Sequence, residues 1–125
     1  MKILLSIKPK FVKAIFSGQK KYEFRKQIFK RNDVNKIVVY SSSPECRIVG
    51  EIEIDSILCD KPDVIWNLTK NSAGISKMFF DEYFKNKEQA YAIKIKTIEK
   101  YERPLKINEI YPNVNPPQSF CYVEE

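Results

Sequence analysis

Eight residues, Gly18–Arg25 (GQKKYEFR), connect a predicted helix to a predicted strand. On a strand, residues two apart lie on one face about 7 Å from each other, so Glu23 and Arg25 face the same side. Lys20 lies at the turn, where its flexible side chain can reach that face. Arg25 and Lys20 would bind a phosphate or base edge, and Glu23 would accept from an amino group or hold the two cations. The alternative is an exposed Glu–Arg ion pair, which stabilises little.

Positive charge is concentrated near the N-terminus of this 125-residue chain. Residues 1–36 carry eleven Lys/Arg and two acids, a net charge of +9, whereas residues 37–125 carry eleven Lys/Arg and fourteen acids, a net charge of −3. This asymmetry indicates a positive face for an anionic partner. The alternative is a solvated lysine-rich surface, since 18 of the 22 basic residues are Lys, which discriminates phosphate less than Arg does.

The remaining sequence predicts strands interleaved with short helices. Tyr22 and Phe24 are assigned to the core, Gly18 is expected to end the first helix, and Gly50 is expected to mark a bulge or a close backbone approach. We expect strands at 2–7, 21–26, 36–42, 48–58, 89–101 and 120–123. A first helix is expected at 9–17. A second should begin at 60–62, with Val64, Ile65 and Leu68 as its apolar face, and a third should follow a cap at Ser76. The pattern favours an α+β fold, a small curled sheet or β-barrel of five to six strands with flanking helices, in one domain over residues 1–125.

Several functional classes are excluded by residue content. The chain has no histidine, so a Ser–His or Cys–His nucleophile pair is impossible and acid–base chemistry must use other side chains. Its three cysteines, Cys46, Cys59 and Cys121, are widely spaced and are expected to be free thiols. A zinc site would need all three thiols and a carboxylate, so we expect no metal, and we expect no cofactor. No apolar run is long enough for a membrane helix or a signal peptide, so we expect no membrane partner and a cytoplasmic location.

The motif Gly-x-Lys-x-x-Glu-x-Arg, after a helix and opening a strand, resembles the signature of the ASCH (activating signal cointegrator homology) domain. Four other segments match small bacterial and archaeal ASCH proteins in the same order: Ser6–Pro9, Tyr40–Ser42, Val49–Glu51 and Pro116–Phe120. The resemblance covers nearly the whole chain. It implies a β-barrel related to the PUA (pseudouridine synthase and archaeosine transglycosylase) domain, with a basic cleft that recognises RNA or a modified nucleotide.

The resemblance also implies site residues. The motif gives Gly18, Lys20, Glu23 and Arg25. Further cleft residues are Lys8, Ser41, Ser42, Gln118 and Ser119. Tyr40 and Phe120 adjoin cleft segments and are therefore candidates for stacking on a base, whereas Trp66 is assigned to helix packing.

Three function classes follow. The first is a binding module for RNA or a modified nucleoside or nucleotide. The second is a small nucleotide-directed hydrolase, for which Lys20 would be a general base or stabilise phosphate charge and Glu23 its partner. The third is a protein-interaction domain that uses the acidic strand Glu51–Asp55 and the aromatic helix at residues 79–84.

Two hydrolase reactions are known among ASCH proteins. Some are ribonucleases. One branch removes the acetyl group of N4-acetylcytidine with a threonine, a lysine and a glutamate; Lys20 matches its lysine, and Glu51 or Glu53 are nearest to its glutamate. Glu23 stands where that branch has its threonine nucleophile, and a carboxylate cannot replace a lysine-activated hydroxyl.

Overall fold

Six strands form one mixed sheet in the order β2-β5-β4-β3-β1-β6 in the computed structural model, which describes residues 1–124. The strands are β1 (Lys2–Ile7), β2 (Tyr22–Arg25), β3 (Lys36–Ser41), β4 (Arg47–Asp60), β5 (Ala90–Leu105) and β6 (Phe120–Val123). β1 pairs with β3 in parallel, and the other neighbours pair antiparallel. The predicted α+β fold is confirmed, and the sheet is a half-barrel.

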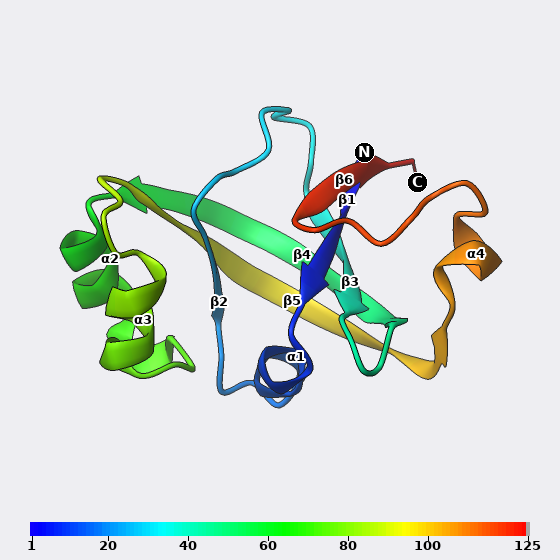
Figure 1. The fold of residues 1–125 in the computed structure, drawn as a ribbon, viewed down its shortest axis with the longest axis horizontal. Helices are drawn as coiled ribbons and strands as arrows, with labels where there is room; N and C mark the ends of the chain where they lie inside the picture. The colour runs from blue at the N-terminus through cyan, green and yellow to red at the C-terminus, as the bar shows by residue number, and fades with distance from the viewer. Residues whose placement is uncertain (125) are drawn as a thin grey trace.

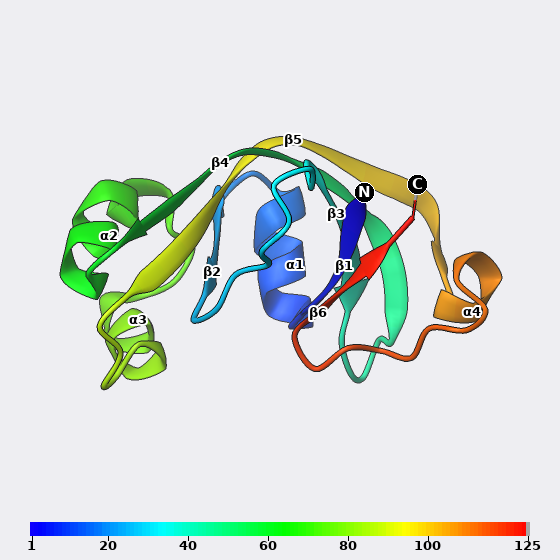
Figure 2. The same cartoon turned by 90° about the horizontal axis from the view of Figure 1, so that it is seen from above.

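Short helices lie at the ends of the sheet and beneath it. They are α1 (Pro9–Phe16), α2 (Pro62–Thr69), the 3₁₀ turn η1 (Lys70–Ser72), α3 (Lys77–Tyr83) and α4 (Ile107–Ile110). α2 and α3 pack at one end of the long β4–β5 pair and α4 at the other (Figure 1). Seen from above, β4 and β5 arch over α1, β1 and β2 (Figure 2). No helix within residues 1–124 has the length and apolar character needed to cross a membrane.

Local sequence explains where the helices begin and end. Proline occupies the first turn of α1 and of α2, where a missing N–H costs nothing. Ser76 caps α3 as predicted, since its Oγ accepts from the Phe79 N–H at 3.1 Å. Gly18 follows α1 with a φ of +85°, a left-handed conformation that glycine adopts without strain. α4 was not predicted, because its four residues are too few to show a helical period.

Bulges bend the long strands. The β4–β5 register shifts between Ile48 and Gly50 and twice more between Glu53 and Ser56, and such irregularities increase twist and curvature. Gly50 is required there, because a Cβ at this position would lie 2.3 Å from the Glu99 carbonyl oxygen. The expectation of a bulge or close approach at Gly50 is confirmed.

Three hydrophobic clusters hold the sheet to its helices. The first joins α1 to β1, β3 and β4 through residues such as Val12 and Ile37; the second joins α2 and α3 to β2 and β5 through Ile65 and Phe80; the third lies near α4. Leu68 was expected on the buried face of α2 but is 60% exposed, and Thr69 is buried instead. Ile65 and Thr69 are four residues apart on α2 and therefore share its buried face, and Leu68 lies beside that face.

Candidate functional site

A pocket of about 590 Å³ lies where the first two clusters meet. Its volume falls in the ~300–1,000 Å³ range of small-molecule sites. Its walls come from the start of α1, β2, α3, the loop after β3 and the C-terminal segment at residues 116–118. Most of the lining is apolar, and the charged groups are three cations and one carboxylate: Lys8, Lys20, Arg25 and Glu23.

Lys20 is a buried cation, only 3% exposed. Its Nζ donates to the Ala73 carbonyl oxygen at 2.9 Å and lies 4.6 Å from the centroid of the Phe24 ring. Burial lowers the pKa of this amine from 10.5 to about 8, although the nearby Glu23 carboxylate opposes the change. Lys20 lies at the turn after α1, as the sequence indicated, and its side chain is held in the wall of the pocket. Part of its population is neutral at mildly alkaline pH.

Glu23 and Arg25 form a largely buried ion pair on β2. Glu23 Oε2 accepts from Arg25 NH1 at 3.2 Å, and the two side chains are 7% and 14% exposed. Burial raises the pKa of the Glu23 carboxyl, and the charges of Lys20 and Arg25 offset part of that rise. The alternative of an exposed ion pair is therefore wrong.

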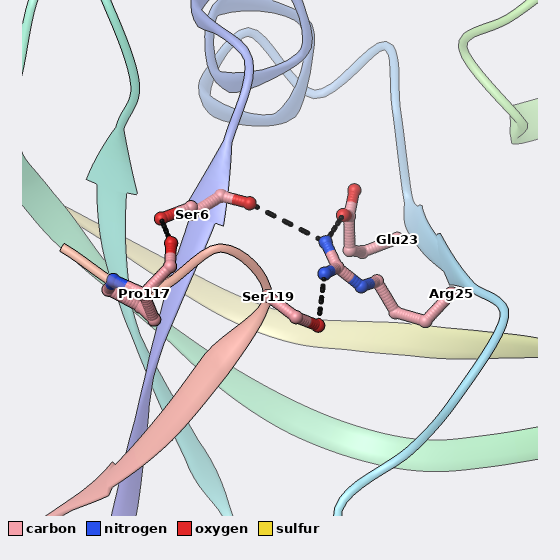
Figure 3. Close-up of polar contacts among 5 residues, drawn as sticks. All are labelled: Ser6, Glu23, Arg25, Pro117 and Ser119. Carbon is pink, nitrogen blue, oxygen red and sulfur yellow. Dashed lines mark hydrogen bonds and ion pairs between the residues drawn. The ribbon is translucent and has the colours of Figure 1, made fainter.

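Arg25 also anchors the C-terminal segment to the pocket (Figure 3). Its NH2 donates to Ser119 Oγ at 2.8 Å and its NH1 approaches the Ser6 carbonyl oxygen at 3.5 Å. Ser6 Oγ in turn donates to the Pro117 carbonyl oxygen at 2.6 Å. Arg25 therefore joins β1, β2 and the segment before β6, which are far apart in the sequence, and this positions Glu23.

Most other sequence-predicted residues gather at the same pocket. Lys8, Tyr40, Ser42 and Gln118 line it together with the charged residues of β2. Tyr40 is 5% exposed, and burial raises the pKa of its hydroxyl.

The remaining predicted residues lie elsewhere. Gly18 forms the turn after α1, and Ser41 is fully buried in β3 with no hydrogen-bond partner among the described residues for its Oγ. Ser119 does not line the pocket, but its Oγ accepts from Arg25 and its carbonyl oxygen accepts from the Ser6 N–H at 3.2 Å, and both partners line the pocket. Phe120 packs edge-on against Phe29, and Trp66 packs on Phe80, as expected for a helix-packing residue.

The aromatic wall of the pocket was missed. Phe11, Phe79 and Tyr83 line it and are half-buried, and Phe24, which was assigned to the core alone, belongs to both the second cluster and the pocket wall. The sequence did contain a sign of this wall. α3 and the residue that follows it carry aromatic rings at 79, 80, 83 and 84, which is more than one buried face of a seven-residue helix needs.

The two acids nearest to the glutamate of the acetylcytidine branch, Glu51 and Glu53, do not line the pocket. Glu51 pairs with Lys2 at 2.9 Å and also contacts Tyr101, and Glu53 accepts from Thr97, so both acids are engaged on β4 away from the pocket lining. Within residues 1–124, no group of three or more Cys, Asp or Glu side chains is placed to hold a metal ion. The three cysteines are free, and Cys46 lies in the pocket wall.

Comparison with known proteins assigns the fold. The family described as "Domain of unknown function (DUF365)" matches residues 2–114. The crystal structure of ASCH from Zymomonas mobilis superposes with a TM-score of 0.90 at 28% identity, covering 99% of this chain and 88% of that chain.

Two curated relatives match at similar identity. An ASCH domain-containing ribonuclease of Zymomonas mobilis is 28% identical over 98% of this chain and 84% of its own length. The large ribosomal subunit protein uL22 of Ureaplasma parvum is 29% identical over 98% of this chain, which spans only 39% of that relative's length.

Proposed function

The chain belongs to the DUF365 family and has the ASCH, PUA-like fold, and on this basis we propose that it binds RNA, or a modified nucleotide, in the pocket beside β2. One nucleotide enters the pocket with its base against the aromatic wall. Lys20, Glu23 and Arg25 lie at the polar side, where they meet the base edge or the phosphate.

The composition of the pocket carries this proposal. A nucleobase has flat faces that stack on aromatic rings and an edge of hydrogen-bond donors and acceptors. The pocket pairs an aromatic wall, Phe11, Phe24, Phe79 and Tyr83, with a buried cation and a buried carboxylate. The net charge of +9 over residues 1–36 suits a polyanion, and one relative of similar length is named a ribonuclease.

A titration of labelled RNA tests the proposal. We expect single-stranded RNA to bind with micromolar or tighter affinity that weakens as salt rises, measured by fluorescence anisotropy. Lys20→Met should weaken binding by about tenfold or more, whereas Lys94→Met, which removes an exposed cation on β5, should change it less than about twofold. Equal affinities for the two variants would contradict the assignment of the site.

RNA cleavage is the second candidate, and the lowered pKa of Lys20 favours it. An amine with a pKa of about 8 can act as a general base near neutral pH, unlike an ordinary lysine. In the reaction we infer, neutral Lys20 takes the proton of a ribose 2′-hydroxyl as that oxygen bonds to the adjacent phosphorus. The bond from phosphorus to the 5′-oxygen breaks, and that oxygen takes a proton from Glu23. The products are a 2′,3′-cyclic phosphate and a 5′-hydroxyl, and no water is consumed.

The charge states fit those roles. Burial raises the pKa of the Glu23 carboxyl, which is the direction of shift that a general acid requires. The rate should rise with pH towards about 8 as Lys20 loses its proton, and should fall when Glu23 loses its proton.

Gel analysis after incubation tests cleavage separately from binding. We expect shortened RNA with cyclic phosphate ends, lost in Lys20→Met and reduced about 100-fold or more in Glu23→Gln. RNA that is bound but intact at every pH would reject cleavage and leave the binding proposal standing.

A further inference from the structure

Three half-exposed aromatic side chains form a continuous ridge at the mouth of the pocket. Phe11 of α1 contacts Phe79 of α3 edge-on at a centroid distance of 5.3 Å, and Phe79 lies parallel to Tyr83 at 6.4 Å with an interplanar angle of 10°. Apolar rings of this size are usually buried in a protein of this length. Their shared exposure on two helices marks a surface that a flat apolar group can cover.

A second hollow lies on the other side of this ridge. It has a volume of about 270 Å³ and shares Phe11, Ile75 and Phe79 with the main pocket. Its remaining walls are Lys10, Gly74 and Ser76. Two rings of the ridge, Phe11 and Phe79, therefore line both cavities, so a chain molecule with one group in the pocket can place its next group in the hollow.

The charges around the ridge are suited to an anion. Lys10 Nζ lies 5.0 Å from the Phe11 centroid and 5.3 Å from the Phe79 centroid, and Lys26 Nζ lies 4.6 Å from the Tyr83 centroid. The charged residues that line the two cavities are four cations, Lys8, Lys10, Lys20 and Arg25, and one acid, Glu23. Among the acids of α3, Asp81 is engaged by Lys77 at 2.7 Å. An aromatic ridge flanked by lysines is the composition that binds single-stranded nucleic acid.

We propose that this hollow is a second nucleotide subsite, which takes the base next to the one in the main pocket. The base lies against Phe79 and Phe11, and Lys10 holds the adjoining phosphate. The inference rests on the proposed function and narrows it. The ligand is a single strand of at least two nucleotides, and a free nucleoside or mononucleotide fills only half of the site.

A length series with a matched pair of variants tests the second subsite. The probes are fluorescein-labelled RNA strands of two, three and four nucleotides, with unlabelled mononucleotides as competitors. Lys10→Glu adds a negative charge in the hollow, and Lys13→Glu makes the same change one turn further along α1, at an exposed position outside both cavities. Phe79→Leu, which removes the ring, tests stacking.

We expect dinucleotides to bind at least about tenfold more tightly than mononucleotides, because the second base adds a stacking contact. Lys10→Glu should weaken tetranucleotide binding about tenfold and Lys13→Glu less than about threefold, while both leave mononucleotide binding within about twofold of the parent. Phe79→Leu should weaken dinucleotide binding about fivefold or more. Because both lysines are exposed, thermal melting of the two charge variants should match that of the parent.

Two results would overturn the second subsite alone: equal tetranucleotide affinities for Lys10→Glu and Lys13→Glu, or no gain in affinity from one nucleotide to two. In both cases the main pocket keeps its ligand. If RNA of every length fails to bind the parent protein, the proposed function is itself wrong, and this inference is wrong with it.

Discussion

Two regions of the sheet carry acid–cation pairs in different surroundings. On β2, Glu23 and Arg25 meet at 3.2 Å with the carboxylate 7% exposed. Across β4 and β5, Lys94 approaches Asp55 at 3.7 Å and Lys96 approaches Glu53 at 3.9 Å, and the Asp55 and Glu53 side chains are 43% and 35% exposed. The β2 pair joins residues two apart on one strand, whereas the other two pairs form between neighbouring strands.

Burial separates them. The β2 pair is enclosed between α1, α3 and the C-terminal segment, where water cannot screen it, and the neighbouring Lys20 has a strongly lowered pKa. The β4–β5 pairs stay in solvent, where ion pairs contribute little. The same kinds of side chain thus form a buried ion pair in one place and an ordinary solvated surface in the other.

The largest expected effect is on stability when the buried pair is broken. Arg25→Met keeps the length of the side chain but leaves the Glu23 carboxylate buried without its partner, so the free energy of unfolding should fall by roughly 2–4 kcal/mol. Lys94→Met, the matched change in the exposed region, should lower it by less than about 0.5 kcal/mol. Urea denaturation measures both, and equal losses would remove the distinction between the two regions.

Lys20 should give the protein a distinctive pH dependence. Its pKa is 10.5 in the unfolded reference and about 8 in the fold, so between these values the unfolded chain binds more protons. The free energy of unfolding should therefore rise with pH from about 8 to 10.5, by roughly 2–3 kcal/mol relative to Lys20→Met, and this difference should be flat below pH 8. If the difference in the free energy of unfolding between the parent and Lys20→Met does not change with pH over this range, Lys20 is not desolvated in the fold.

Two glycines with a positive φ differ in whether they lie against the site. Gly74 has a φ of +70°, and a Cβ there would lie 2.4 Å from the Lys20 Cβ, whereas Gly18, with a φ of +85°, has nothing within 4 Å. Gly74→Ala should cost about 2 kcal/mol and displace Lys20, lowering RNA affinity, while Gly18→Ala should cost about 1 kcal/mol with affinity retained. Loss of RNA binding in Gly18→Ala would give that turn a direct role.

The smallest expected effect concerns the C-terminal segment. Ser119→Ala removes the 2.8 Å hydrogen bond to Arg25 and should lower the free energy of unfolding by about 1 kcal/mol. RNA affinity should fall a few-fold, because Arg25 would position Glu23 less firmly. An unchanged denaturation midpoint would show that Arg25 keeps its position without this contact.

The sequence predicted the strands, the α1 turn and the Ser76 cap because these depend on local periodicity and local hydrogen bonds. It also placed Lys20, Glu23 and Arg25 in one segment. It did not predict the burial of Lys20, because the groups that lie against this side chain come from other elements. Ala73 is 53 residues further along the chain, and Phe11 lies on α1, before the turn. The aromatic wall was missed for the same reason: rings on α3 lie either in the core or on a pocket according to what packs opposite them.

Chemical-shift mapping with ¹⁵N-labelled protein shows where on the molecule RNA binds. A single-stranded RNA tetranucleotide is titrated in while the amide signals of β2 and of the β4–β5 pairs are followed. If RNA binds in the pocket, the signals of Lys20, Glu23, Arg25 and the aromatic wall should shift saturably, and those of Asp55 and Lys94 should stay unchanged. Shifts confined to the exposed β4–β5 charges would contradict binding in the pocket, and so would the absence of shifts there.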